Sequence, residues 1–287
     1  MSALSFTFGT VGSPKSTPKK PGGSVGGVIH SADLGLFCLE LGWVRSVRVS
    51  ENTCEKIRTS AEEKGVAISV HAPYFINLNA DDEEWPKSRK RLMDAAIYGN
   101  LAGATDIVFH PGSYFELPPD EVLPKAITRL RGCVDELRSA DNPVFLRPET
   151  MGKSAMLGSL EDTLQMSLEI EGVQPCFDVA HLFARPGDGS LNSYDDWARA
   201  LEIYGKKLGD ESLKQLHIHI SGIEYGQKGE KEHQPLDKSE FDYKAFLKAL
   251  SDFNCQGRIL CESPILEEDA LLCKSTWCEV SGETCAE

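Results

Sequence analysis

Short runs of apolar residues recur along almost the whole chain, each separated from the next by a longer stretch with a helical pattern. The runs are rich in β-branched and aromatic residues, which is typical of buried parallel strands. The predicted strands cover residues 4–8, 36–41, 66–70, 106–109, 144–147, 175–179, 216–220 and 258–262. The predicted helices cover residues 51–64, 83–101, 120–140, 160–170, 193–207, 239–253 and 266–276. This alternation predicts an α/β fold, a (β/α)8 TIM barrel.

Residues that favour helix starts support these boundaries. Ser50, Ser193 and Ser239 each stand before a helical stretch and are predicted N-caps. A barrel commonly fills a chain of this length, so we expect one domain over residues 1–287. A doubly wound open sheet is the alternative fold, although it would seldom carry ligand-type residues on so many strands.

The ends of the chain are expected to be irregular. Residues 1–30 hold a Gly/Pro/Lys-rich first loop, and residues 277–287 form a C-terminal tail. The GGSVGG stretch within the first loop lacks the GK[ST] ending of a phosphate-binding loop, so we interpret it as flexible. Residues 9–27 and 221–237 are long connections that follow strands, which places them at the functional mouth of a barrel.

Composition limits the class of protein. The hydrophobic fraction of 41% is enough for one large core, and no apolar run is long enough to span a membrane. The nine cysteines show no CxxC spacing, which favours reduced, packed thiols in a cytoplasmic protein. The formal net charge of −14 argues against broad, non-specific attraction to nucleic acid. It does not exclude a nucleic-acid enzyme, because metal cations and a basic rim can reverse the field within a cleft.

Histidine and carboxylate residues stand where the predicted strands end. They are His71, His110, Glu149, Asp178, His217 and Glu262. The ends of barrel strands converge on one mouth, so these side chains are expected to lie close together. His181 follows Asp178 by three residues, and His233 lies in the loop after the seventh strand. His217 and His219 share one face of that strand, so either could be the ligand.

This mixture of nitrogen and oxygen ligands suits zinc, with manganese or iron as alternatives. Eight candidate ligands exceed what one four-coordinate zinc uses, so two or three ions are expected. Clustered divalent ions serve phosphodiester hydrolysis especially well, which makes it the first candidate activity. A sugar isomerase or epimerase on the same barrel is the competing hypothesis. A non-catalytic metal- or ligand-binding barrel is a third.

Several segments carry a resemblance to a known family. They read VHAPYFINL, FHPG, RPETMGKSAMLGSLED, CFDVAHLFA, LHIHISGIEYGQKGEKEHQPL and CESP, and they cover strands three to eight. In these segments the chain resembles the endonuclease IV family of apurinic/apyrimidinic endonucleases, on a xylose-isomerase-like barrel. The segments LRPETMGK and HISGIEYG are most similar to those of an archaeal branch of this family. The resemblance implies cleavage of DNA 5′ to abasic sites, in base excision repair, with three zinc ions.

The resemblance also implies roles for individual residues. His71, His110 and Glu149 would hold one zinc, and Glu149 would bridge to a second and orient the attacking hydroxide. The second zinc would also take Asp178, His217 and Glu262, and the third would take His181 and His233. The family's third zinc has an aspartate two residues before the last histidine, where this chain has Lys231. Either Glu230 or Glu232 substitutes for it, or the third ion is weak or absent.

The expected partner is double-stranded DNA that contains abasic sites, bound by a monomer and without a membrane. Tyr74 and Asn77 follow His71 on a loop that lines the DNA groove in the family. Lys228 and Lys231 lie beside His233 and could meet a backbone phosphate. We expect the damaged nucleotide to be extruded into a pocket, because an unpaired nucleotide needs little free energy to leave the duplex.

Overall fold

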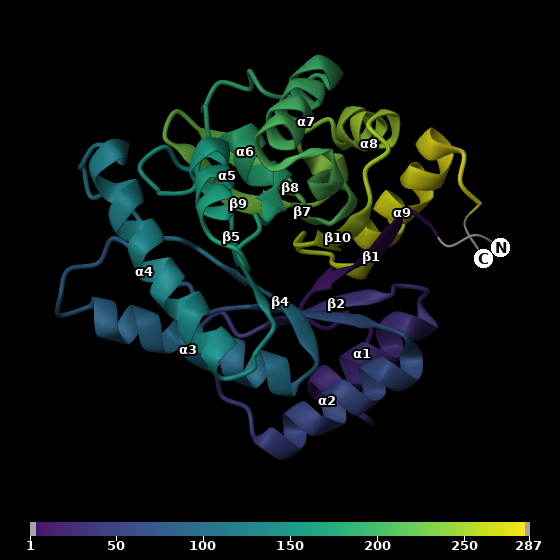
Figure 1. Cartoon of the computed structure of the whole chain (residues 1–287). Helices are drawn as coiled ribbons and strands as arrows, with labels where there is room; N and C mark the ends of the chain where they lie inside the picture. Colours follow the sequence, from purple (N-terminus) through teal and green to yellow (C-terminus); the bar gives the residue numbers. More distant parts are fainter. Residues whose placement is uncertain (1–3, 285–287) are drawn as a thin grey trace.

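The computed structural model describes residues 4–284, and its centre is a sheet of parallel strands curled into a barrel (Figure 1). The sheet order is β5-β4-β3-β2-β1-β10-β7-β6, and isolated parallel bridges, Leu146 to Val173 and Glu149 to Cys176, join its two edges. The barrel strands are β1 (Phe6–Val11), β2 (Cys38–Gly42), β3 (Ala67–His71), β4 (Ala104–Phe109), β5 (Phe145–Pro148), β6 (Phe177–Asp178), β7 (Leu216–Ile220) and β10 (Gly257–Cys261). The predicted (β/α)8 TIM barrel is confirmed.

Helices surround the barrel on its outside (Figure 1). They are α1 (Gly23–Asp33), α2 (Glu51–Lys64), α3 (Trp85–Leu101), α4 (Pro119–Ser139), α5 (Leu160–Glu169), α6 (Val179–Ala184), α7 (Tyr194–Leu208), α8 (Tyr243–Asp252) and α9 (Glu267–Ser281), with short 3-10 turns η1 (Asp210–Lys214) and η2 (Leu236–Lys238). Ser50 and Ser193 cap their helices as predicted, each accepting a backbone N–H bond. Ser239 does not cap α8, because Asp242 takes that place and Ser239 binds Ile223 instead.

The first loop is shorter than predicted, because helix α1 begins at Gly23, inside the GGSVGG stretch. Two of its glycines allow close packing within the helix region. A Cβ on Gly26 would lie 1.9 Å from the carbonyl oxygen of Pro21, and one on Gly27 would lie 2.2 Å from Oγ of Ser13. The predicted C-terminal tail is also partly helical, since α9 runs to Ser281; residues 285–287 and 1–3 lie outside the described residues.

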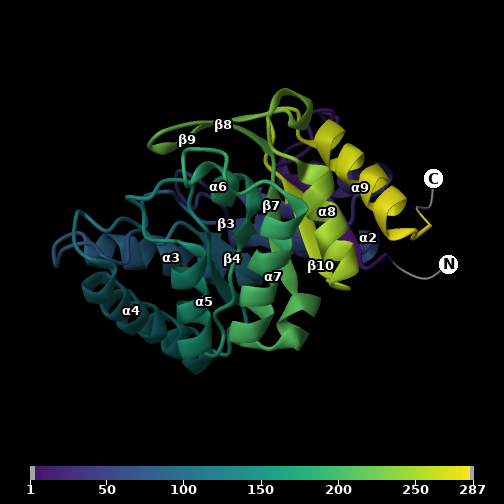
Figure 2. The same cartoon turned by 90° about the horizontal axis from the view of Figure 1, so that it is seen from above.

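A two-stranded antiparallel hairpin is the main addition to the barrel. It consists of β8 (Gly222–Gly226) and β9 (Gly229–Gln234), and it lies at the top of Figure 2. The hairpin follows β7, so it stands at the carboxyl end of the barrel strands, where the sequence predicted a long functional connection. A backbone bond from the N–H of Glu230 to the carbonyl of Gly152 fixes it to the loop after β5.

Polar side chains fill much of the barrel interior. At the amino-terminal end of the strands, Asp106 binds the guanidinium groups of Arg147 and Arg258. Above them the inward side chains of β2, β3 and β7 are also polar, with Glu40, Ser69 and His217 all fully or almost fully buried. Apolar side chains gather between the barrel and its helices. This arrangement leaves the barrel axis for chemistry that an apolar core could not support.

Among the described residues, none of the helices combines the length and the apolar character that a membrane crossing would need.

Candidate metal centre

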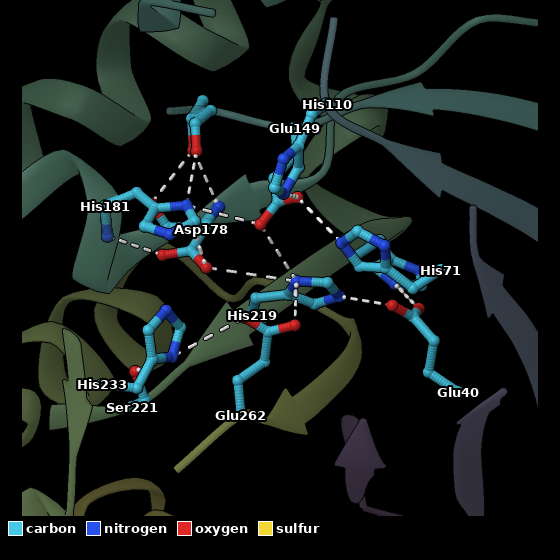
Figure 3. Close-up of polar contacts among 12 residues, drawn as sticks. Glu40, His71, His110, Glu149, Asp178, His181, His219, Ser221, His233 and Glu262 are labelled. Atoms are coloured by element: carbon cyan, nitrogen blue, oxygen red, sulfur yellow. Dashed lines mark hydrogen bonds and ion pairs between the residues drawn. The ribbon is translucent and has the colours of Figure 1, made fainter. Parts of the chain in front are cut away.

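The carboxyl ends of the barrel strands surround a cavity of about 440 Å³. Imidazole and carboxylate groups from the ends of six barrel strands, from α6 and from the hairpin point into it or lie just beneath it (Figure 3). The metal-ligand cluster, as we call this set, comprises His71, His110, Glu149, Asp178, His181, His219, Glu230, His233 and Glu262. The parallel strands explain the convergence, because their carboxyl ends all meet at one mouth.

Glu149 lies at the centre of the cluster and is fully buried. Its Oε2 lies 3.1 Å from Nε2 of His71 and 3.1 Å from Nε2 of His110. Its Oε1 lies 3.3 Å from Nδ1 of His219 and 3.4 Å from Nδ1 of His181. One carboxylate therefore faces two separate groups of imidazoles, which is the arrangement that a bridging ligand requires.

A second group forms around His219. Its Nδ1 lies 3.4 Å from Oε1 of Glu262 and 4.0 Å from Oδ2 of Asp178. Glu149, Asp178, His219 and Glu262 offer ligand atoms that all lie within 4.8 Å of one another. The sequence placed His217 in this group and left His219 as an alternative. The structure brings His219 to the carboxylates.

His217 lies two residues earlier on β7 and so one layer deeper in the barrel. There its Nε2 lies 3.0 Å from Oε2 of Glu40. Both histidines face inward, because alternate residues of a strand share a face. Only the one nearer the carboxyl end reaches the mouth.

A third group joins α6 to the hairpin. Nε2 of His181 lies 3.3 Å from Oε2 of Glu230, and the rings of His181 and His233 meet edge to face at 5.4 Å. Lys231, at the position of the family's aspartate, instead pairs with Glu224 at 2.7 Å. Glu232 is exposed. Of the two acids that the sequence offered as substitutes, the structure brings Glu230 to the site.

Close backbone packing sets the place of Glu230. A Cβ added to Gly152 would lie 2.1 Å from Oε2 of Glu230, and one added to Gly229 would lie 2.0 Å from the carbonyl oxygen of Gly152. Glycine at both positions therefore lets the hairpin lie against the loop after β5. This contact holds the Glu230 carboxylate over His181.

The charges of the cluster are crowded. Burial would raise the pKa of Glu149, but the imidazoles of His110, His181 and His219 hold it well below its usual range. Burial alone would lower the pKa of His71, yet the hydrogen-bonded Glu149 raises it to about 9. Burial raises the pKa of Asp178, and the carboxylates of Glu149 and Glu262 add to the rise. A bound cation stabilises the ionised form of carboxylates that lie this close together.

The donor set fits divalent metal ions. Nitrogen and carboxylate oxygen are ligands that zinc and manganese accept. Oδ2 of Asp178 and Oε2 of Glu230 are buried, and within residues 4–284 neither has a hydrogen-bond partner. A buried oxygen without a hydrogen-bond partner lowers the stability of the folded state, and a bound cation would compensate for the missing bond.

The predicted DNA-contacting residues fall into two kinds. Tyr74 is half exposed, and its ring stacks on His110 with centroids 4.9 Å apart, at the rim of the cavity. Asn77 supports the loop instead, since its side-chain oxygen accepts the backbone N–H of Asn79 at 2.9 Å. Lys228 and Lys231 are exposed on the hairpin. Tyr74 is thus the one of the four that lines the cavity.

Glu40 is a polar residue directly beneath the metal-ligand cluster that sequence reasoning did not identify. It stands in the middle of the apolar run of β2 and is fully buried. Burial opposes its ionisation, but the imidazoles of His219 and His217 hold its pKa well below the usual range. A carboxylate within an otherwise apolar strand was the available signal, because such a group requires buried partners.

Comparisons with known proteins agree with the geometry. A profile of the xylose isomerase-like TIM barrel family matches residues 29–274. An uncharacterised protein of Methanocaldococcus jannaschii is 37% identical over 94% of this chain and 96% of its own length. A probable endonuclease 4 of Staphylococcus aureus (strain JH9) is 30% identical over 70% of this chain and 68% of its own length.

Two solved structures share the fold. Endonuclease IV from Thermus thermophilus gives a TM-score of 0.70 at 22% identity, covering 96% of this chain and 100% of that one. A D-tagatose 3-epimerase-like protein gives 0.64 at 19% identity, covering 86% and 90%. At these identities the likeness shows the barrel alone. Because the family profile spans most of the sequence, the chain belongs to the xylose isomerase-like TIM barrel family, with endonuclease 4 proteins among its relatives.

Proposed function

We propose that the protein is a metal-dependent endonuclease that hydrolyses DNA on the 5′ side of abasic sites, as part of base excision repair. One observation carries the proposal: more ligands converge on Glu149 than a single ion can use. The group of Glu149, Asp178, His219 and Glu262 would suffice for one ion. His71 and His110 on one side, and His181, His233 and Glu230 on the other, extend this group to a site for two or three ions.

The proposed ions are zinc, with manganese as the alternative. His71, His110 and Glu149 would hold the first, and Glu149, Asp178, His219 and Glu262 the second. His181, His233 and Glu230 would hold the third, with Glu230 in place of the family's aspartate. When bound, such ions activate a water as hydroxide and offset negative charge on the phosphoryl oxygens.

The residues of the chain supply position and charge. Glu149 faces both imidazole groups with its two oxygens, so it is placed to orient the attacking water between them. Tyr74 presents a half-exposed ring beside His110, a surface against which an extruded sugar can pack. Lys228 and Lys231 place positive charge on the hairpin, where backbone phosphates would be met. We further propose a single domain that acts as a cytoplasmic monomer on double-stranded DNA.

A duplex oligonucleotide with one tetrahydrofuran residue, a stable mimic of an abasic site, tests this function. We expect a nick on the 5′ side of the mimic that EDTA abolishes and zinc restores. Glu149→Gln should lower the rate by about 10⁴-fold or more, as removal of a central catalytic group does. Glu232→Gln is the matched control, because it makes the same change on an exposed side chain of β9. An intact duplex after incubation with fully metal-loaded protein would contradict the proposal.

A sugar isomerase or epimerase is the second candidate. The group of Glu149, Asp178, His219 and Glu262 favours it, because four such ligands can hold the single ion that this chemistry needs. Metal analysis separates the two functions before any substrate is tried. Two or three zinc ions per chain support the nuclease, whereas one manganese or magnesium ion together with ketose turnover supports the isomerase.

A further inference from the structure

We propose that Glu40 is a positioning residue for the metal centre, because it fixes the orientation and the tautomer of His219 from beneath. This inference rests on the metal site proposed above and does not depend on whether the substrate is DNA or a sugar. It adds a residue of β2, a strand that carries none of the nine residues of the metal-ligand cluster.

The His219 ring is held between two sets of carboxylates. Its Nδ1 faces the metal-ligand cluster, 3.3 Å from Glu149 and 3.4 Å from Glu262. Its Nε2 faces the opposite way and lies 3.0 Å from Oε1 of Glu40 (Figure 3). Within the described part of the chain, Nε2 of His219 and Oε1 of Glu40 are both buried and neither has a hydrogen-bond partner, so their mutual contact at 3.0 Å is an ion pair. This contact is therefore the one that compensates the burial of both atoms.

The second oxygen of Glu40 is held firmly by the protein. Oε2 accepts a hydrogen bond from Oγ of Ser69 at 2.7 Å and lies 3.0 Å from Nε2 of His217. Because an ionised carboxylate only accepts hydrogen bonds, Nε2 of His217 must be the donor. These two bonds prevent rotation of the carboxylate and leave Oε1 directed at His219. The residues below the cluster thus hold the imidazole of His219 in one orientation.

The chemical consequence concerns the proton on His219. An imidazole that binds a cation through Nδ1 would keep one N–H, on Nε2, and a carboxylate can accept it. Glu40 would therefore favour the proton on Nε2 and leave the lone pair of Nδ1 for a cation shared with Glu149, Asp178 and Glu262. A carboxylate that accepts the second N–H of a metal-binding histidine fixes its ring and makes it a stronger ligand. Loss of such a partner typically weakens metal binding by about 10–100-fold.

The test compares metal binding by the full chain and by Glu40→Gln, which keeps the size of the side chain and removes its charge. Zinc affinity is measured by competition with a chromophoric chelator, and ligand geometry by the absorption spectrum of the cobalt(II)-loaded protein. We expect Glu40→Gln to weaken one zinc ion by about 10–100-fold and to alter the cobalt spectrum. Glu40→Asp keeps the charge but shortens the side chain. Its zinc affinity should lie between those of the unaltered chain and of Glu40→Gln.

Asp106→Asn is the matched control. It also exchanges a buried acid of the barrel interior for an amide, but this carboxylate pairs with Arg147 and Arg258 and with no residue of the metal-ligand cluster. It should keep zinc affinity within about threefold, even if it lowers the melting temperature as much as Glu40→Gln does. A purely structural Glu40 would lower the melting temperature and leave zinc affinity and the cobalt spectrum unchanged, which would overturn the inference.

The outcomes separate this inference from the proposed function. If the unaltered chain binds no divalent ion, the metal centre itself fails. If it binds ions and Glu40→Gln binds them equally well with the same cobalt spectrum, only the role of Glu40 fails. Should Glu40→Gln not fold, Glu40→Asp is judged by the same two measurements.

Discussion

The two ends of the barrel interior both bury charged side chains, but they treat them differently. At the amino-terminal end, the floor network of Asp106, Arg147 and Arg258 matches one acid with two cations, although within residues 4–284 Nη1 of Arg258 has no hydrogen-bond partner. Arg147 donates to Asp106, to the carbonyl of Pro175 and to the side chain of Gln174, and Arg258 lies 3.2 Å from Asp106. At the carboxyl end, ligand atoms of the acids Glu149, Asp178 and Glu262 lie within 4.8 Å of one another. Within residues 4–284, buried oxygens of Asp178 and Glu230 have no hydrogen-bond partner.

This difference separates a structural network from a functional one. Buried charges that lie against charges of opposite sign supply their own counter-charge and help to fix a fold. Buried acids that repel one another need a component that the chain does not supply, and here the fitting component is a group of divalent cations. Variants at the two ends should therefore fail in different ways, one through folding and the other through metal binding.

The largest expected effect on stability comes from the floor. Asp106→Asn removes the carboxylate between two buried or nearly buried guanidinium groups, so Arg147 is left without its counter-charge. Breaking such a pair should cost about 3–5 kcal/mol in the free energy of unfolding. Denaturant titration measures this loss, and the folded fraction should keep its full metal content.

The control for that variant is Asp82→Asn. Asp82 is fully exposed and lies 3.6 Å from Arg129, so its loss should leave the free energy of unfolding almost unchanged. Equal costs for the two variants would remove the distinction between the floor network and an ordinary surface pair.

Metal removal should reverse the pH dependence of stability. In the metal-free chain the pKa of His71 is raised to about 9, so the folded state keeps a proton that the unfolded state releases above its own pKa near 6.5. This contribution is complete below about pH 6.5 and is lost as the pH rises through about 9. The raised pKa of Asp178 acts in the same direction, because its proton is also retained in the folded state.

Bound zinc competes with these same protons, so the metal-loaded chain should instead gain stability as the pH rises from 6.5 to 9. Melting temperatures at several pH values, measured after chelation and after reloading, check the prediction. Parallel curves for the two forms would show that the raised pKa values have no connection with a metal site.

The sequence predicted the barrel because the evidence for it is local. Each strand is a short apolar run, and each helix a longer amphipathic stretch, so neither depends on distant contacts. Helix α1 escaped prediction because glycine usually indicates a turn, and here its value lies in contacts with Ser13 and Pro21. Such contacts exist only in the folded chain.

The sequence predicted the site well where a strand carries one candidate ligand. It predicted the site less well where two candidates on one strand lie at different depths in the barrel. His217 and His219 have the same residue type and face the same side of β7. Their difference comes from the register, in which His219 pairs with Leu260 and so lies beside the strand end that leads to Glu262. Glu40 was missed for a related reason, since its partners are 29 and 177 residues away along the chain.

The third group of ligands offers a sharper test of the metal-ligand cluster. Glu230→Gln removes the carboxylate that lies 3.3 Å from His181, so the proposed third ion should bind about 10–100-fold more weakly while the two other proposed ions remain. Metal content after dialysis at low free zinc checks this expectation. Glu232→Gln, two residues away on the same strand, should keep the full number of ions.

The smallest predicted effects are those of the two hairpin lysines on DNA binding. Lys231 already pairs with Glu224 at 2.7 Å, whereas no ion pair involving Lys228 is found in residues 4–284. A free cation that meets a phosphate contributes about one unit to the slope of log affinity against log salt, and a neutralised one contributes less. Lys228→Gln should therefore lower the slope by about one, and Lys231→Gln by less than that. Binding of a tetrahydrofuran duplex to the Glu149→Gln protein, measured at several salt concentrations, compares them without cleavage. Equal reductions would show that the Glu224 pair opens when DNA binds.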